Sequence, residues 1–143
     1  MYIKSKRNAF LSGEIGWWRL WQFQQERFPL LQHGPVLVIF SASAVCYSWL
    51  LLRSGQAVVS AQSFLIAALF SITFFLQLRI IDEVQDAEQD ALLRPYRPIP
   101  RGLVSRRELI FLGTLVATSQ LLIAYLLTPQ LLSLLFGVWF FMW

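Results

Sequence analysis

Two long runs without a charged side chain constrain this sequence more than any other feature. Residues 28–52 and residues 54–78 contain no Asp, Glu, Lys or Arg, and only Arg53 separates the two runs. A helix of about 20 apolar residues crosses the hydrocarbon core of a bilayer, which is about 30 Å thick. Both runs are long enough, so the sequence predicts transmembrane helices near residues 30–52 and 57–78.

The C-terminal part of the sequence predicts a third span and part of a fourth. Residues 109–143 also lack charged side chains, and Thr128-Pro129-Gln130 interrupts their apolar character as a turn would. We therefore expect a third span near residues 109–127. Residues 131–143 are too few to cross a bilayer, so they form either a re-entrant segment or, as we favour, a fourth span that is cut short. The predicted fold class is an all-α polytopic transmembrane bundle, with residues 1–143 in one domain.

The composition excludes several other classes of protein. Hydrophobic residues make up 57% of the chain and charged residues 14%, whereas an ordinary soluble domain has about 25% charged residues. These values argue against a water-soluble globule and against a disordered chain. The single cysteine, Cys46, excludes a domain held together by disulfides.

The basic residues predict the orientation of the chain in the membrane. Ten of the twelve Lys and Arg residues lie either at or before Arg27 or from Arg94 onward, and the loop between the first two spans contains only Arg53. Basic residues collect on the cytoplasmic side of membrane proteins, so the N-terminus and residues 79–108 are both predicted to be cytoplasmic. We attribute the net charge of +4 to this bias, and we expect membrane lipid but no nucleic acid as a partner.

The segment before the first span has the pattern of a helix at the membrane surface. Its apolar and polar residues fall on opposite helical arcs: Trp17, Leu20, Trp21 and Phe28 against Arg19, Gln22 and Glu26. Such an amphipathic helix lies in the membrane interface. We expect it to anchor the first span, and the alternative is a role in gating the substrate.

The segment between the second and third spans, residues 79–108, carries twelve of the twenty charged side chains. Asp82, Asp86 and Asp90 are spaced at i, i+4 and i+8, so their carboxylates stack on one face if the helix continues past Leu78. Like charges at this spacing repel each other, and a divalent cation removes the repulsion. Oxygen ligands without His or Cys favour a hard ion, in particular Mg²⁺.

A run of arginines and prolines follows the acidic residues. Residues 94–102 read RPYRPIPRG, and the prolines end the helix and hold an extended turn. The turn presents Arg94, Arg97 and Arg101, and a planar guanidinium can bind a phosphate through two hydrogen bonds. Carboxylates, a metal and arginines at the mouth of an apolar bundle favour a ligand with a diphosphate head and an apolar tail, such as a polyprenyl diphosphate. The alternative is a simple cytoplasmic collar of charges around the helix ends.

These two stretches read DEVQDAEQD at residues 82–90 and RPIPRGLVS at residues 97–105. They resemble the first aspartate-rich motif and the following loop of the UbiA-like intramembrane prenyltransferases, which run Asn-Asp-x-x-Asp-x-x-x-Asp and then Arg-Pro-x-x-x-Gly with a Ser soon after. Asp86 and Asp90 match the two metal-ligand aspartates of that motif. The chain departs from the pattern at its first two positions, where Asp82 replaces Asn and Glu83 replaces Asp.

The resemblance implies an activity and a role for each matched residue. UbiA-like enzymes are helical membrane bundles that transfer a prenyl group from a Mg²⁺-bound polyprenyl diphosphate to a lipophilic acceptor, often an aromatic one. By this resemblance the metal and catalytic residues are Asp82, Asp86 and Asp90, with Asp82 as an additional ligand or as a partner of one, and the diphosphate contacts are Arg94, Arg97 and Arg101.

The family also has a second aspartate motif, Asp-x-x-x-Asp, in its other half. Here Glu108 is the only acidic residue after Asp90. Together with the short fourth span, this leads us to expect the N-terminal half of a prenyltransferase, inactive as a transferase without the half that carries the second motif. The alternative function is a non-catalytic membrane subunit or a transporter fragment, although a transporter would place its carboxylates within a span.

Overall fold

The computed structural model describes residues 16–52, 59–127 and 129–142, and these residues form helices and no strand. The helices are α2 (Trp17–Arg27), α3 (Leu30–Leu52), α4 (Ala61–Gln85), α5 (Ala87–Leu93), α6 (Arg106–Leu127) and α7 (Leu131–Met142). The prediction of an all-α fold is confirmed.

Three of these helices are long and apolar enough to cross a membrane, namely α3, α4 and α6. Helix α3 has the predicted bounds. Helix α4 begins at Ala61 and continues to Gln85, beyond the predicted end at Leu78, and α6 begins at Arg106. The predicted start of the second span at residue 57 lies outside the described residues, as does Arg53. Helix α7 is shorter than a full span.

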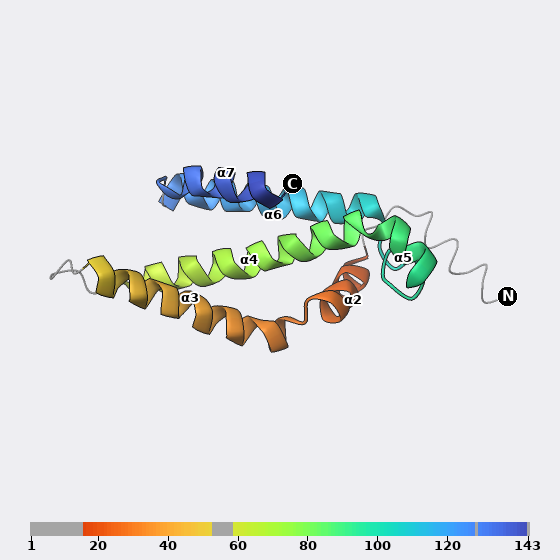
Figure 1. Ribbon diagram of the computed structural model, residues 1–143, viewed down its shortest axis with the longest axis horizontal. Coiled ribbons are helices and arrows are strands. Elements are labelled where there is room, and N and C mark those ends of the chain that lie inside the picture. The colour runs from red at the N-terminus through yellow and green to blue at the C-terminus, as the bar shows by residue number, and fades with distance from the viewer. Residues whose placement is uncertain (1–15, 53–58, 128, 143) are drawn as a thin grey trace.

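The long helices lie side by side, with α4 between α3 and α6, and α7 packs along α6 (Figure 1). Helices α2 and α5 lie together at one end of the bundle, where α4 ends and α6 begins. The segment that precedes the first span and the charged segment 79–108 therefore share one end, as the predicted topology requires. We refer to this end as the charged end.

Much of the apolar surface of the bundle is exposed. Leu31, Phe140 and Phe141 are each at least 80% exposed, and many other large apolar side chains of α3, α6 and α7 are exposed as well. An apolar surface of this extent would cause aggregation in water, whereas lipid tails cover it in a bilayer. The chain is therefore an integral membrane protein.

The best-packed part of the molecule is at the charged end. A buried cluster is formed by Phe23 of α2, Ile80 of α4, Val104 of the loop before α6, and Leu109 of α6. The loop of residues 94–105 connects α5 to α6. Because the cluster joins this loop to α2, α4 and α6, it fixes the position of the loop relative to the end of α4.

Local sequence signals shape the same loop. Pro95 follows the end of α5 and prevents the helix from continuing, and Gly102 has a positive φ of 74° that reverses the chain. Ser105 and Glu108 then begin α6 with a capping box: the Glu108 backbone N–H donates to Ser105 Oγ at 3.2 Å, and the Ser105 N–H donates to Glu108 Oε2 at 2.6 Å.

The residues of the predicted apolar arc of the first helix differ in their burial. Trp17 and Trp21 are exposed, whereas Phe28 is buried and Leu20 packs against the buried cluster. The reason is that Phe23, outside the predicted arc, enters the core, so α2 has one side toward the protein and leaves its tryptophans outside.

Candidate functional site

The three aspartates of the first motif lie at the charged end, where α4 passes into α5. Helix α4 continues past Leu78 as expected but ends at Gln85, and α5 begins at Ala87. Backbone hydrogen bonds continue across the junction, because the Asp86 N–H donates to the Asp82 carbonyl at 2.9 Å and the Asp90 N–H donates to the Asp86 carbonyl at 2.8 Å. The aspartates therefore remain one turn apart, but they are carried by two helices and not by one continuous helix.

Arg97 joins two of these aspartates. Its Nη1 atom lies 2.9 Å from Asp90 Oδ2 and 4.0 Å from Asp86 Oδ2. The Asp90 side chain is 5% exposed and the Asp86 side chain is 51% exposed. The two carboxylates thus approach the same guanidinium, and this group of three residues, which we call the Arg97 cluster, is open to solvent through Asp86.

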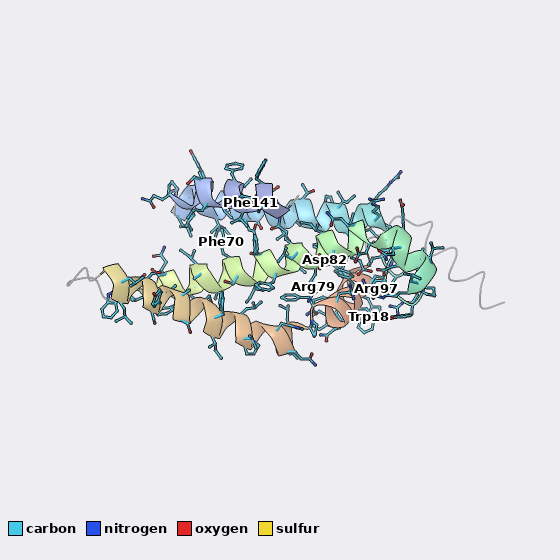
Figure 2. The ribbon with its side chains drawn as sticks, viewed as in Figure 1. Trp18, Phe70, Arg79, Asp82, Arg97 and Phe141 are labelled. Carbon is cyan, nitrogen blue, oxygen red and sulfur yellow. The ribbon has the colours of Figure 1, made fainter. Side chains whose placement is uncertain are left out.

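Asp82 stands apart from the Arg97 cluster. It pairs with Arg79, three residues earlier on α4, at 3.5 Å, and both side chains are about half exposed. Figure 2 shows Arg79, Asp82 and Arg97 together at the charged end of the bundle. Within residues 16–52, 59–127 and 129–142, no three Asp, Glu, His or Cys side chains are grouped as a metal site. A role for Asp82 as an additional ligand stays a prediction.

The three predicted diphosphate-binding arginines point to different partners. Arg97 contacts the acidic residues, whereas Nη2 of Arg101 donates to both carboxylate oxygens of Glu26, at 2.9 and 2.8 Å. Arg94 is exposed, and its backbone N–H donates to the Asp90 carbonyl at the end of α5. The structure therefore brings one of the three arginines to the aspartates.

Sequence reasoning missed the contribution of α2 to this site. Arg27 Nε lies 2.6 Å from Glu83 Oε2, and the Glu83 side chain is fully buried. Arg19 donates from Nε to the Leu103 carbonyl at 2.6 Å and from Nη1 to Glu108 Oε1 at 3.2 Å. In the sequence, Arg19 lies on the predicted polar face of the amphipathic segment, whereas Arg27 lies beside Leu20 on the helical wheel and gave no such signal.

An apolar cavity of about 360 Å³ lies between α4, α6 and α7. Among the described residues, its lining includes Gln77, Gly113 and Trp139 but no charged side chain. None of the three residues of the Arg97 cluster lines this cavity, although Gln85, the neighbour of Asp86 in sequence, does.

The family model of the UbiA prenyltransferase family matches residues 37–143, which is well over half of the chain. The chain belongs to the UbiA prenyltransferase family. The resemblance inferred from residues 82–105 is thereby confirmed, and membership of the UbiA family suggests prenyltransferase activity. No curated protein and no solved structure matches the chain.

UbiA enzymes typically use Mg²⁺, and the carboxylates of Asp86 and Asp90 are of the type that would hold such an ion. Asp90 Oδ2 is buried and accepts no hydrogen bond, although Arg97 lies 2.9 Å from it, because the pair has the distance but not the angle of a hydrogen bond. Mg²⁺ is usually held by one or two carboxylates together with water and phosphate oxygens. Asp86 and Asp90 supply this number of carboxylates, and they are the residues that would hold the ion.

Proposed function

We propose that this UbiA-family chain binds a polyprenyl diphosphate at its charged end, with Mg²⁺, for transfer of the prenyl group to a lipophilic acceptor. The observation that carries the proposal is the position of Arg97, 2.9 Å from Asp90 and 4.0 Å from Asp86. The two carboxylates already converge on a positive charge, and the same arginine has further N–H groups with which to bind phosphate.

Binding a diphosphate requires positive charge beyond that of one metal ion. Arg97, Arg101 and Arg94 all lie within the short 94–102 segment that follows the aspartates. Guanidinium groups bind phosphate with charge-assisted hydrogen bonds, often two to one phosphate group. We assign Arg97 as the first contact because it already lies beside the carboxylates, and Arg101 and Arg94 as further contacts.

The transfer would break the bond between the allylic carbon and the diphosphate oxygen, and the electron pair would leave with the diphosphate. A bound Mg²⁺ would neutralise part of the charge that develops on the leaving group. The arginines donate to the same oxygens, and these hydrogen bonds strengthen as the charge grows. The apolar helices keep water from the allylic carbon until the acceptor forms the new bond, and the proton that the acceptor loses passes to the released diphosphate.

We further propose that the charged end faces the cytoplasm. Helix α2 and residues 79–108 lie at the same end of the bundle, and most of the basic residues of the sequence flank or belong to these segments. Short segments rich in Lys and Arg remain on the cytoplasmic side. The diphosphate would then enter from the cytoplasm, while the prenyl tail extends into the membrane.

The test is ligand binding to the purified protein in nanodiscs. Labelled geranyl diphosphate, inorganic diphosphate and geraniol are compared in the presence of Mg²⁺ and of EDTA. We expect geranyl diphosphate to bind most tightly, because it supplies both the charged head and the apolar tail, and we expect its binding to need Mg²⁺. The Arg97→Gln variant should bind it at least about tenfold more weakly.

Two outcomes would contradict the proposal. Equal binding of geraniol and geranyl diphosphate would show that the charged end does not recognise the diphosphate. Failure of the diphosphate to bind in any form would favour the non-catalytic membrane subunit, in which residues 79–108 are only a collar of charges.

A further inference from the structure

Two neighbouring residues at the end of α2, Glu26 and Arg27, contact both sides of the proposed binding site. Arg27 pairs with Glu83 on α4, one turn before the junction with α5. Glu26 accepts two hydrogen bonds from Nη2 of Arg101 on the 94–105 loop, at 2.8 and 2.9 Å. The last turn of α2 therefore holds the acidic helix with one side chain and the arginine loop with the next.

The two ion pairs differ in their exposure to solvent. The side chains of Arg27 and Glu83 are 21% and 0% exposed, whereas those of Arg101 and Glu26 are 40% and 34% exposed. Breaking a buried pair leaves an uncompensated charge inside the protein, but the groups of an exposed pair can separate at little cost because water solvates them. The buried pair is thus a permanent attachment of α2, and the exposed pair can exchange partners.

The exposed pair occupies an arginine that the proposed function needs. The carboxylate of Glu26 presents two anionic oxygens to one Arg101 nitrogen, as a phosphate group would. Gln22 on the preceding turn of α2 donates to Glu26 Oε1 at 3.0 Å, which helps to hold the carboxylate in place. Arg101 is therefore already paired with a carboxylate.

We propose that Glu26 is an internal competitor for Arg101, which a diphosphate displaces when it binds. This inference rests on the proposed function, since it assigns Arg101 to the same ligand. Glu26 sets the affinity of the site by occupying Arg101 until a group with more negative charge replaces it. When the exchange occurs, α2 loses the Glu26–Arg101 pair but keeps its attachment through Arg27 and Glu83 and its hydrogen bond from Arg19 to the Leu103 carbonyl.

The prediction that separates this role from a structural one is a gain of affinity. In the Glu26→Gln variant Arg101 is released, so Mg²⁺-diphosphate should bind about two- to fivefold more tightly, the range that an exposed ion pair provides. A residue that only supported the fold would weaken binding when changed. The substitution is nearly isosteric and on the surface, and Glu26→Ala serves as a second variant with the same expected gain.

The experiment is calorimetric titration of inorganic diphosphate with Mg²⁺ into the protein in phosphatidylcholine nanodiscs, which contain no anionic lipid. Glu88→Gln is the matched control: Glu88 is an exposed carboxylate of α5, and its removal changes the net charge equally without releasing an arginine. The same Glu26→Gln change is also made in an Arg101→Gln background, where it should have no effect on the dissociation constant.

Each result supports or overturns a defined part of the inference. A gain for Glu26→Gln that depends on Arg101 and exceeds the effect of Glu88→Gln supports the exchange. Three results would overturn the exchange while leaving the proposed function in place. They are an unchanged or weaker affinity in Glu26→Gln, an equal gain in Glu88→Gln, and a gain for Glu26→Gln that persists without Arg101. Absence of diphosphate binding to the unaltered protein overturns both the inference and the proposed function.

Discussion

The buried ion pair between Arg27 and Glu83 gives the most direct prediction about how the charged end is held together. The Glu83 side chain has no exposed surface, and its carboxylate is paired with Arg27, whose Nε lies 2.6 Å away. The Arg27→Gln substitution removes this opposite charge and leaves the carboxylate buried. Removing one partner of a buried pair costs about 3–5 kcal/mol. Because the Arg27 side chain is itself 21% exposed, we expect the lower value, about 3 kcal/mol.

This loss should appear as easier opening of α2 and not as unfolding of the membrane bundle. Hydrogen exchange of the α2 backbone amides in nanodiscs measures the opening equilibrium, which should rise about a hundredfold for a loss of this size. Glu26→Gln breaks the adjacent exposed pair and should raise the opening equilibrium by less than about fivefold. The double variant Arg27→Gln/Glu83→Gln should recover most of the loss, since no charge is left buried. If Arg27→Gln had no larger effect than Glu26→Gln, the reasoning from burial would be refuted.

Three further predictions concern the topology, a helix cap and a contact within the membrane. Cysteines introduced at Ser105 and Gln56 should be labelled from opposite sides of the membrane, and cytoplasmic labelling at Gln56 would contradict the topology. Ser105→Ala removes the capping hydrogen bond of α6 and should lower the free energy of unfolding by about 1 kcal/mol, measured by denaturant titration in micelles; an unchanged value would argue against the cap. Gln120 donates to Thr73 across α4 and α6 at 2.8 Å, so Gln120→Leu should cost about 0.6 kcal/mol in the same titration, and a loss of several kcal/mol would show that the bond carries more than is usual in membranes.

The membrane-spanning part of the fold could be predicted because the bilayer imposes a simple requirement. A span needs an uninterrupted apolar length, and the charge-free run that ends at Leu52 gave the bounds of α3 correctly. The end of α4 was harder to predict. Ile80 and Glu83 are buried by packing against other elements, so the helix continues beyond the point at which its sequence stops being apolar.

The junction at Asp86 was not predictable from local sequence. No Pro or Gly occurs in residues 82–90, and yet Asp86, with φ −79° and ψ −6°, has a ψ outside the usual α-helical range. The change of helix there accompanies a tertiary contact, in which Asp90 is buried against Arg97. The sequence pattern grouped all three aspartates, and only the packing, which brings Arg97 to Asp86 and Asp90, separates Asp82 from the other two.

The contacts of α2 were equally hidden in the sequence. Arg27 and Glu83 are far apart along the chain, and neither residue type is expected to be buried without its partner. The opposite apolar and polar arcs of residues 17–28 predicted a surface helix. They could not show which charged side chains of that helix contact the rest of the protein. Phe23 decides this, because its burial fixes the rotation of α2.

The central claim is that Asp86 and Asp90 hold Mg²⁺ for a diphosphate, and the most direct test is the Mg²⁺ dependence of diphosphate affinity. Calorimetric titrations of the unaltered protein are compared with those of Asp86→Asn, Asp90→Asn and the neighbouring Glu88→Gln. We predict that binding requires Mg²⁺, that each aspartate variant weakens it by at least about tenfold, and that Glu88→Gln changes it by less than about twofold. Equal losses in all three variants, or full affinity in EDTA, would contradict the claim, because negative charge in general or the arginines alone would then account for binding.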